Sequence, residues 1–238
     1  MRGSWRCIAM ALFLFLGAVF DSMILKFVAH SKRVLKIAAE YGWLPGARYT
    51  NLRDIREFSQ VGFIDIDWKD YSFKKHLAAV KSTNPLMTVA RDIERVGELS
   101  KTLDQAHELR QHCKYVIIVP KHPSLASRLD SLIPGVFALG YSVPTRYGGT
   151  KIPTKAFTRP VHLLGGRPEV QRRLATHMPV VSVDCNRFTL DAAFGDYFDG
   201  ERFRPHPRGG YLKCIRDSIE NINKIWVGYP GGNLINAG

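Results

Sequence analysis

Three aspartates stand at or just after the ends of short apolar runs that lie far apart in the chain, at Asp65, Asp92 and Asp184. Carboxyl groups serve as nucleophiles or as general acids and bases, and two of them in unlike environments can divide these roles. An aspartate after a strand also commonly caps the next helix by accepting its free backbone N–H groups. Both interpretations are open for each aspartate alone, but three at equivalent positions favour catalysis.

The apolar runs predict parallel strands buried on both faces, because they are short and continuous rather than alternating. We expect amphipathic helices between them, where apolar residues recur at helical spacing. The expected strands are 34–39, 61–66, 86–90, 115–119, 136–139, 161–164 and 180–183, with a weaker eighth at 222–227, and the expected helices are 70–81, 93–113, 168–177 and 213–221.

The spacing of these elements indicates the fold. Strand starts are mostly about 20–30 residues apart, the period of a strand followed by a helix. Seven or eight such units predict a compact, single-domain (β/α)8 barrel of the TIM type, with its active site at the carboxyl ends of the strands. A doubly wound sheet usually has a Gly-rich phosphate loop after its first strand. Residues 40–46, Glu-Tyr-Gly-Trp-Leu-Pro-Gly, lack that GxGxxG pattern, which favours the barrel.

Other chemically useful residues follow or lie within the same predicted strands. The turn Gly165-Gly166-Arg167 precedes a predicted helix and can hold a phosphate on backbone N–H groups, or it is simply a turn that needs positive φ. His162 lies inside an apolar strand, where a histidine is more often a hydrogen-bonded core residue than a ligand. The candidate substrate-binding residues are Asp92, Lys121, Gly140, Tyr141, Ser142, His162, Gly165, Gly166 and Asn186.

The charge balance favours a polyanionic partner. There are 34 Lys and Arg against 21 Asp and Glu, a formal net charge of +13. Phosphate contacts by such a surface are favourable because they release counterions. Arginines alternate with aromatic residues in the segment 195–210, as in loops that bind single strands, although a solvated insertion has the same composition. The candidate nucleic-acid-binding residues are Arg167, Arg187, Arg202, Arg204 and Arg208.

The first 22 residues differ from the rest of the chain. The apolar run 7–20 follows two arginines and is too short to span a bilayer comfortably, but it resembles the apolar part of a signal peptide. Translation starting at Met23 is the favoured alternative, since no small-x-small cleavage motif precedes Asp21. We therefore expect an extension, 1–22, and a barrel domain, 23–238, with no membrane partner. Scattered cysteines without a CxxC pair predict no metal site and a cytoplasmic location.

Five short motifs occur in order at the predicted strand ends. They are Phe63-Ile64-Asp65, Thr88-Val89-Ala90-Arg91-Asp92, Leu139-Gly140-Tyr141-Ser142, His162-Leu163-Leu164-Gly165-Gly166 and Val183-Asp184-Cys185-Asn186. Over about residues 30–225 this order resembles the tRNA-guanine transglycosylase superfamily, and more closely its short phage-type relatives, the DpdA-like DNA-guanine transglycosylases. Members of that family exchange a guanine in nucleic acid for a 7-deazaguanine base.

The resemblance implies a role for each matching residue. Asp184 would be the nucleophile that attacks C1′ of the nucleoside, and Asp65 the general acid and base, with Asp67 as the alternative if the strand register differs. Asp92 would hydrogen-bond the guanine-like base, and the turn at Gly140 and Tyr141 would offer backbone groups to it. One C–N glycosidic bond breaks and another forms, so no cofactor is expected.

One departure from the family bears on the substrate. The longer tRNA enzymes carry a zinc site of clustered cysteines and a histidine, which this chain lacks, and this favours DNA whose target base is flipped out. We thus expect a DNA-guanine transglycosylase, a pentosyltransferase that takes up a free 7-deazaguanine derivative. Two alternatives stay open: a TIM-barrel enzyme for a small phosphorylated substrate held by Gly165-Gly166-Arg167, and a non-catalytic basic DNA-binding module whose aspartates cap helices.

Overall fold

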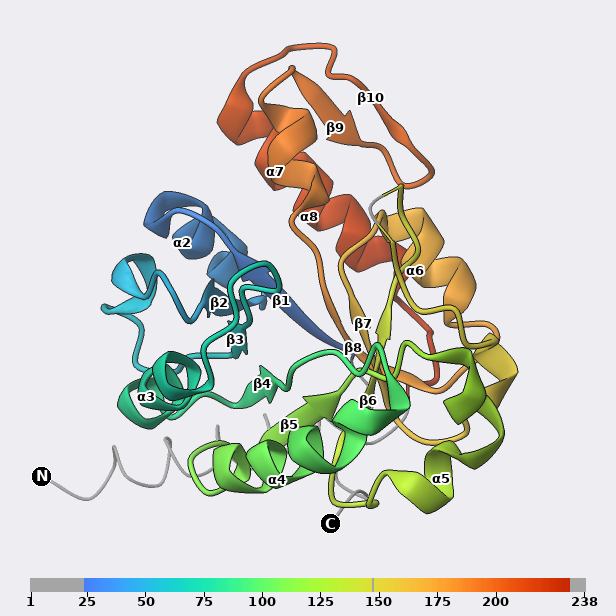
Figure 1. Cartoon of the computed structure of the whole chain (residues 1–238). Coiled ribbons are helices and arrows are strands. Elements are labelled where there is room, and N and C mark those ends of the chain that lie inside the picture. Colours follow the sequence, from blue (N-terminus) through green and yellow to red (C-terminus); the bar gives the residue numbers. More distant parts are fainter. Residues whose placement is uncertain (1–23, 147, 232–238) are drawn as a thin grey trace, which may run out of the picture.

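The computed structural model describes residues 24–146 and 148–231, and this part of the chain forms a closed barrel of eight parallel strands (Figure 1). The barrel closes where β1 pairs with β8, with Phe27 opposite Asp184. The predicted (β/α)8 barrel is confirmed, while the extension 1–22 lies outside the described residues. The strands are β1 (Leu25–Ala29), β2 (Leu44–Arg48), β3 (Phe63–Asp65), β4 (Met87–Val89), β5 (Tyr115–Ile118), β6 (Ala138–Ser142), β7 (Val161–Leu164) and β8 (Val180–Asp184).

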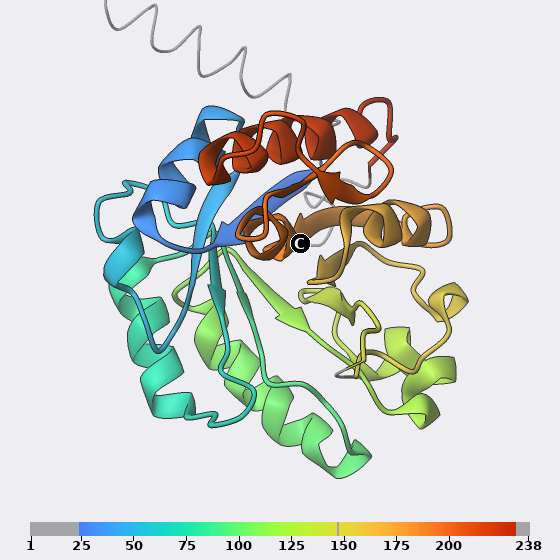
Figure 2. The same cartoon turned by 90° about the horizontal axis from the view of Figure 1, so that it is seen from above.

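Helices surround the strands, as the view from above shows (Figure 2). They bury apolar faces against the outside of the barrel, and short 3-10 turns join several of them to the strands. Among the described residues, no helix has the length and apolar character needed to cross a membrane. The helices are α2 (Lys32–Glu40), α3 (Phe73–Thr83), α4 (Leu99–Arg110), α5 (Leu129–Leu132), α6 (Pro168–Leu174), α7 (Arg187–Ala192) and α8 (Tyr211–Ile225).

The start of the barrel differs from the prediction. The segment 34–39, expected as the first strand, lies in helix α2, where Val34, Leu35, Ile37 and Ala38 bury one face at helical spacing. The true first strand is β1, and β2 occupies part of the segment expected as a turn. Its sequence, Leu-Pro-Gly-Ala-Arg, contains two residues that usually interrupt strands. At the other end, 222–227 is not a strand, because α8 continues to Ile225.

The segment expected as a turn after the fifth predicted strand is itself strand. Gly140 and Tyr141 lie inside β6, where Gly140 is paired with His162 of β7. A Cβ at Gly140 would lie 2.6 Å from Ile117, 2.8 Å from Val119 and 2.9 Å from Leu164. Glycine is therefore required here because the interior of the barrel has no room for a side chain.

The basic segment 195–210 is a folded hairpin rather than an open loop. Strands β9 (Asp196–Phe198) and β10 (Phe203–Pro205) pair antiparallel and pack on α8. The backbone N–H of Phe198 donates to Ser218 Oγ at 2.9 Å. Figure 1 shows the hairpin beside α7 at the top of the molecule. Since α7 follows the carboxyl end of β8, the hairpin lies on the side of the barrel mouth.

A layer of rings fills the barrel interior below the mouth. Phe27 and Phe63 are fully or almost fully buried, and their ring centroids are 5.6 Å apart. The His162 ring completes the layer, 5.9 Å from Phe27 and 5.3 Å from Phe63. The next inward-facing side chains along β3 and β8 therefore point into the mouth of the barrel, and the layer of rings closes the barrel beneath them.

Candidate active site

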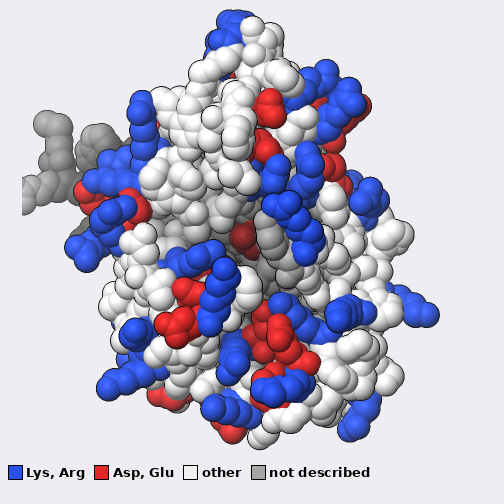
Figure 3. All heavy atoms as spheres, turned by 45° about the horizontal axis from the view of Figure 1, so that its top comes forward, with Lys and Arg blue, Asp and Glu red and all other residues white. Residues whose placement is uncertain are grey.

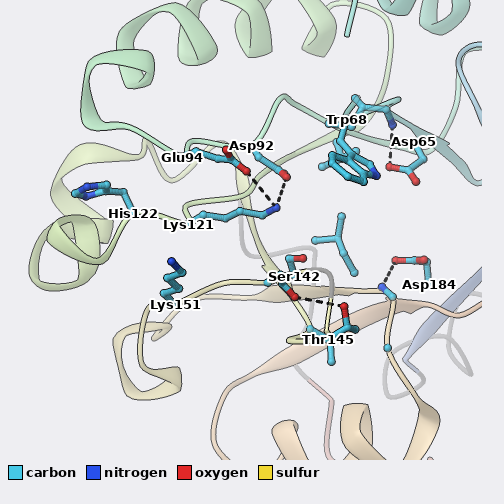
Figure 4. A pocket seen from close by; sticks show the side chains of 18 of the residues that line it. Asp65, Trp68, Asp92, Glu94, Lys121, His122, Ser142, Thr145, Lys151 and Asp184 are labelled. Atoms are coloured by element: carbon cyan, nitrogen blue, oxygen red, sulfur yellow. Dashed lines mark hydrogen bonds and ion pairs between the residues drawn. The ribbon is translucent and has the colours of Figure 1, made fainter. Parts of the chain in front are cut away.

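A cavity of about 680 Å³ opens at the carboxyl ends of the strands, where a TIM barrel carries its active site. Asp65, Asp92 and Asp184 all line it, so the structure brings together three carboxylates that are remote in sequence. Figure 4 shows Asp65 and Asp184 at one end of the cavity and Asp92 further along it. From outside, the cavity is a hollow with an acidic side chain deep inside and Lys and Arg around its rim (Figure 3).

Asp65 ends β3 directly above the ring of Phe63. Its carboxylate accepts a hydrogen bond from the backbone N–H of Ile66 at 2.8 Å. Removal from water, and then the negative charge of Asp184, raise the pKa of Asp65 to about 7; the Ile66 N–H and the positive charge of Arg48 oppose this rise. Near neutral pH the group can therefore both donate and accept a proton, as a general acid and base must.

Asp184 ends β8 on the opposite wall. Its Oδ1 accepts a hydrogen bond from the backbone N–H of Gly165 at 2.9 Å. The buried Gln171 holds this arrangement together, because its Nε2 donates to the carbonyl oxygens of both Gly165, at 2.7 Å, and Asp184, at 2.8 Å. Asp65 and Asp184 thus face one cavity, and each accepts one backbone N–H, but their surroundings differ: removal from water dominates at Asp65, whereas Gln171 and the Gly165 turn hold Asp184.

His162 lies beneath Asp184 in the barrel interior and does not line the cavity. Its side chain is fully buried, with Nδ1 at 2.8 Å from Ser182 Oγ and Nε2 at 3.4 Å from Asp184 Oδ1. Although it was among the substrate-binding candidates, His162 is a hydrogen-bonded core histidine, the alternative that its apolar strand favoured, and its second nitrogen faces a carboxylate.

Asp92 forms an ion pair with Lys121. Lys121 Nζ lies 2.6 Å from Asp92 Oδ2 and 3.8 Å from Glu94 Oε1 (Figure 4). Removal from water raises the pKa of Asp92, and the neighbouring ammonium opposes this rise. The pair presents a carboxylate acceptor and an ammonium donor side by side toward the same space, which is suitable for the edge of a heterocyclic base.

None of the three aspartates caps a helix. The N-cap positions of the elements that follow them are Ser72 for α3, Arg95 for the 3-10 turn Val96–Glu98 and Asn186 for α7. The helix-capping alternative is therefore wrong for these residues. Asn186 itself accepts a hydrogen bond from the N–H of Ala29 at 2.9 Å, which joins the ends of β8 and β1 outside the cavity.

Several other predicted residues are placed away from the cavity. Asp67 accepts from the N–H of Lys69 and lines a neighbouring hollow, not the main cavity. Tyr141 is buried on the outer side of β6, its ring 5.2 Å from that of Phe157. Those that do line the cavity with the three aspartates are Lys121, Ser142, Gly165 and Gly166.

The predicted nucleic-acid-binding arginines do not line the cavity. Arg187 makes two hydrogen bonds of 2.6 Å to Asp191, and Arg204 pairs with Asp199. Arg167 is 2.8 Å from Glu169 and lies over the ring of Phe203. Arg202 and Arg208 are exposed on and after the hairpin.

The cavity lining also includes residues that the sequence did not predict, among them Arg48, Trp68 and Lys151. Arg48 ends β2, a strand that the sequence pattern did not predict, so nothing in the sequence indicated that Arg48 lies at the rim. Trp68 is 63% exposed, although tryptophan is usually covered, and it follows the β3 end by three residues. An aromatic side chain just after the strand end that carries Asp65 was the available signal. Arg48 and Trp68 also line the neighbouring hollow of about 480 Å³.

Within residues 24–146 and 148–231, no group of three or more His, Cys, Asp or Glu side chains is arranged to hold a metal ion.

Comparison with known proteins adds a family and a fold relative. No curated protein matches the chain. Among solved structures, the YdjI aldolase from Escherichia coli K12 is similar at 12% identity and a TM-score of 0.50, over 88% of this chain and 93% of that one. Identity this low shows a shared fold alone. Residues 38–227 match DUF6610, a family of unknown function, and this range covers most of the chain. The chain therefore belongs to the DUF6610 family.

Proposed function

We propose that this protein is an enzyme, a pentosyltransferase that exchanges guanine in DNA for a 7-deazaguanine derivative through a covalent aspartyl–nucleoside intermediate. One observation carries the proposal: Asp65 and Asp184 face the same cavity from unlike environments. Base exchange at C1′ needs one carboxylate that stays ionised as nucleophile and one carboxyl that shuttles a proton. The order of strand-end motifs supports the same assignment by resemblance.

In the first half of the reaction, a carboxylate oxygen of Asp184 attacks C1′ of the target nucleoside. The C1′–O bond forms as the C1′–N9 bond breaks, and its electron pair leaves with the guanine. Asp65 donates its proton to the departing base and becomes a carboxylate. The transition state is oxocarbenium-like, as in retaining glycosidases, and the negative charge of Asp184 stabilises its positive charge.

In the second half, the incoming 7-deazaguanine loses its N9 proton to Asp65 and attacks C1′ through N9. The ester bond to Asp184 breaks and its electrons return to the carboxylate. Both aspartates are then in their initial protonation states, so the exchange needs no external acid, base or energy source. The pKa of Asp65, about 7, suits a group that must donate in one half and accept in the other.

Recognition of the base falls to the far part of the cavity. A volume of about 680 Å³ is within the usual range for small-molecule sites and can contain a purine with its sugar. Asp92 and Lys121 can accept from and donate to the base edge. Arg48 and Lys151 line the cavity, and contacts from them to the phosphates of a flipped nucleotide would offset part of the cost of flipping.

The phosphorylated-substrate alternative is less well supported. Its phosphate site required the N–H groups of Gly165-Gly166-Arg167, but Asp184 accepts the N–H of Gly165. A phosphate there would have to displace a carboxylate and lie beside its negative charge.

The test is incubation of duplex DNA, single-stranded DNA or tRNA with the protein and radiolabelled guanine. Labelled guanine should enter DNA with the wild-type protein, and Asp184→Ala should abolish incorporation and the denaturant-stable protein–DNA adduct. Asp67→Ala is the matched control, because it removes a nearby carboxylate outside the cavity. Full exchange by the Asp184 variant would remove this residue from the nucleophile role. Turnover of a free sugar phosphate without nucleic acid would favour the alternative.

A further inference from the structure

The carboxylate of Asp184 is held by one oxygen only. Oδ1 accepts the Gly165 N–H at 2.9 Å and faces His162 Nε2 at 3.4 Å, whereas no hydrogen bond reaches Oδ2 from any residue in the described ranges. Asp184 lines the cavity, so the oxygen without a partner is the one available to a reacting atom. Two neighbours on one oxygen thus select which oxygen reacts.

His162 is an unusual neighbour for this purpose because it is completely buried. Its ring packs against those of both Phe27 and Phe63, and its Nε2 has no hydrogen-bond partner within bonding geometry among the described residues. A buried polar nitrogen left unsatisfied costs stability, so its presence needs an explanation. This nitrogen faces Asp184 Oδ1 at 3.4 Å, and a contact with that carboxylate accounts for its place in an otherwise apolar layer.

The chemistry of the ring decides where its proton lies. Nδ1 is 2.8 Å from Ser182 Oγ, whose hydroxyl can donate to an unprotonated Nδ1 or accept from a protonated one. With the proton on Nδ1 alone, the Nε2 lone pair would face the lone pairs of an ionised carboxylate. With the proton on Nε2, whether the ring is neutral or cationic, an N–H faces Oδ1 instead. Electrostatics therefore selects an N–H on Nε2, and in the neutral ring the Ser182 hydroxyl then donates to Nδ1.

We propose that His162 is a positioning residue that directs an Nε2–H group at Asp184 Oδ1, so that Oδ2 is presented to C1′. This inference rests on the proposed function, in which Asp184 is the nucleophile. The separation of 3.4 Å is long for a hydrogen bond. Such contacts commonly tighten when a substrate is bound. The chain Ser182–His162–Asp184 crosses from β8 to β7 and back inside the barrel, which makes it rigid.

The contact itself is tested by NMR of protein labelled with 15N-histidine, and this measurement does not depend on any activity. The His162 signal is assigned with the variant His162→Asn. We expect the wild-type ring to carry its proton on Nε2, with a downfield Nε2–H resonance that moves upfield in Asp184→Ala. A neutral ring with its proton on Nδ1, or an Nε2–H resonance that Asp184→Ala leaves unchanged, overturns the inference.

The catalytic consequence is tested with two matched variants. Asn at position 162 can reach Ser182 but not Asp184, whereas Gln can place an amide N–H near the position of Nε2. His162→Asn should form the covalent intermediate about 10- to 100-fold more slowly at unchanged KM, the loss expected for one hydrogen bond to a charged group. His162→Gln should keep most of the rate.

Unfolding free energies of both variants separate positioning from packing. Equal rate losses in His162→Asn and His162→Gln, tracking equal losses of stability, overturn the inference. Absence of exchange in the wild-type protein rejects the proposed function and the catalytic consequence with it, and the NMR result then decides the contact alone. Normal exchange by the wild type with no difference between the two variants rejects only the role of His162.

Discussion

The replacement Asp65→Asn tests the electrostatic core of the proposal. It removes a charge from the cavity at nearly constant side-chain volume and keeps an oxygen that can accept the Ile66 N–H. Because burial raises the pKa of Asp65 from 3.8 to about 7, the folded protein binds this proton more tightly than the unfolded chain does. The contribution of protonated Asp65 to the free energy of unfolding is therefore lost as the pH rises from about 4 to about 7. Above about pH 7 the full cost of ionising Asp65 is present.

The magnitude follows from the same values. At about 1.36 kcal/mol for each pH unit between 3.8 and about 7, ionisation of Asp65 costs the fold about 4 kcal/mol. This is an upper limit, because the side chain is partly exposed to the cavity, where solvent reduces the penalty. We expect Asp65→Asn to be more stable than the wild type by about 2 to 3 kcal/mol at pH 8 and nearly equal to it at pH 4.

The assay is urea unfolding of both proteins at several pH values between 4 and 8. Asp67→Asn serves as the control, since Asp67 is outside the cavity and should show no comparable pH-dependent gain. A stability difference between Asp65→Asn and the wild type that is the same at every pH would refute the reasoning, as would a variant that is less stable at pH 8. The variant should also lose base exchange, because its amide cannot shuttle a proton.

Two further predictions concern the barrel interior and its mouth. Gly140→Ala should destabilise the protein by about 1–3 kcal/mol, because the added methyl overlaps the side chains of Ile117 and Val119; an unchanged melting temperature would contradict this packing. Trp68→Ala should weaken binding of a fluorescent single-stranded oligonucleotide about tenfold by removing an exposed stacking surface at the cavity mouth, while Trp68→Phe keeps most of the affinity. Equal dissociation constants by fluorescence anisotropy would exclude a contact with Trp68.

The strands that the pattern identified are short segments rich in apolar residues. Segments such as 115–119 and 161–164 read as buried parallel strands and are strands β5 and β7. The pattern failed at β2, because its Pro and Gly look like a turn, and at α2, because Val and Ile on one helix face look like a strand run. Local propensity decides neither case, since burial in the barrel overrides it.

Residue types at strand ends were enough to predict which carboxylates converge. Asp65, Asp92 and Asp184 reach one cavity because all parallel strands of a barrel end at the same rim, whatever the loops between them. Residue types did not predict the direction in which each side chain points. Asp65 points into the mouth and Asp67 does not, a distinction set by strand register and by the point where β3 ends.

The sequence by itself therefore determined the alternation of strands and helices, the barrel and the set of acidic residues on its rim, because these follow from local pattern and from the geometry of parallel strands. Only the tertiary structure decided the contacts that give each group its chemistry. The backbone N–H of Gly165 on Asp184, the buried His162 beneath it and the ion pair of Asp92 with Lys121 all join residues from different strand ends. Their distances depend on how the barrel closes, and no local pattern encodes them.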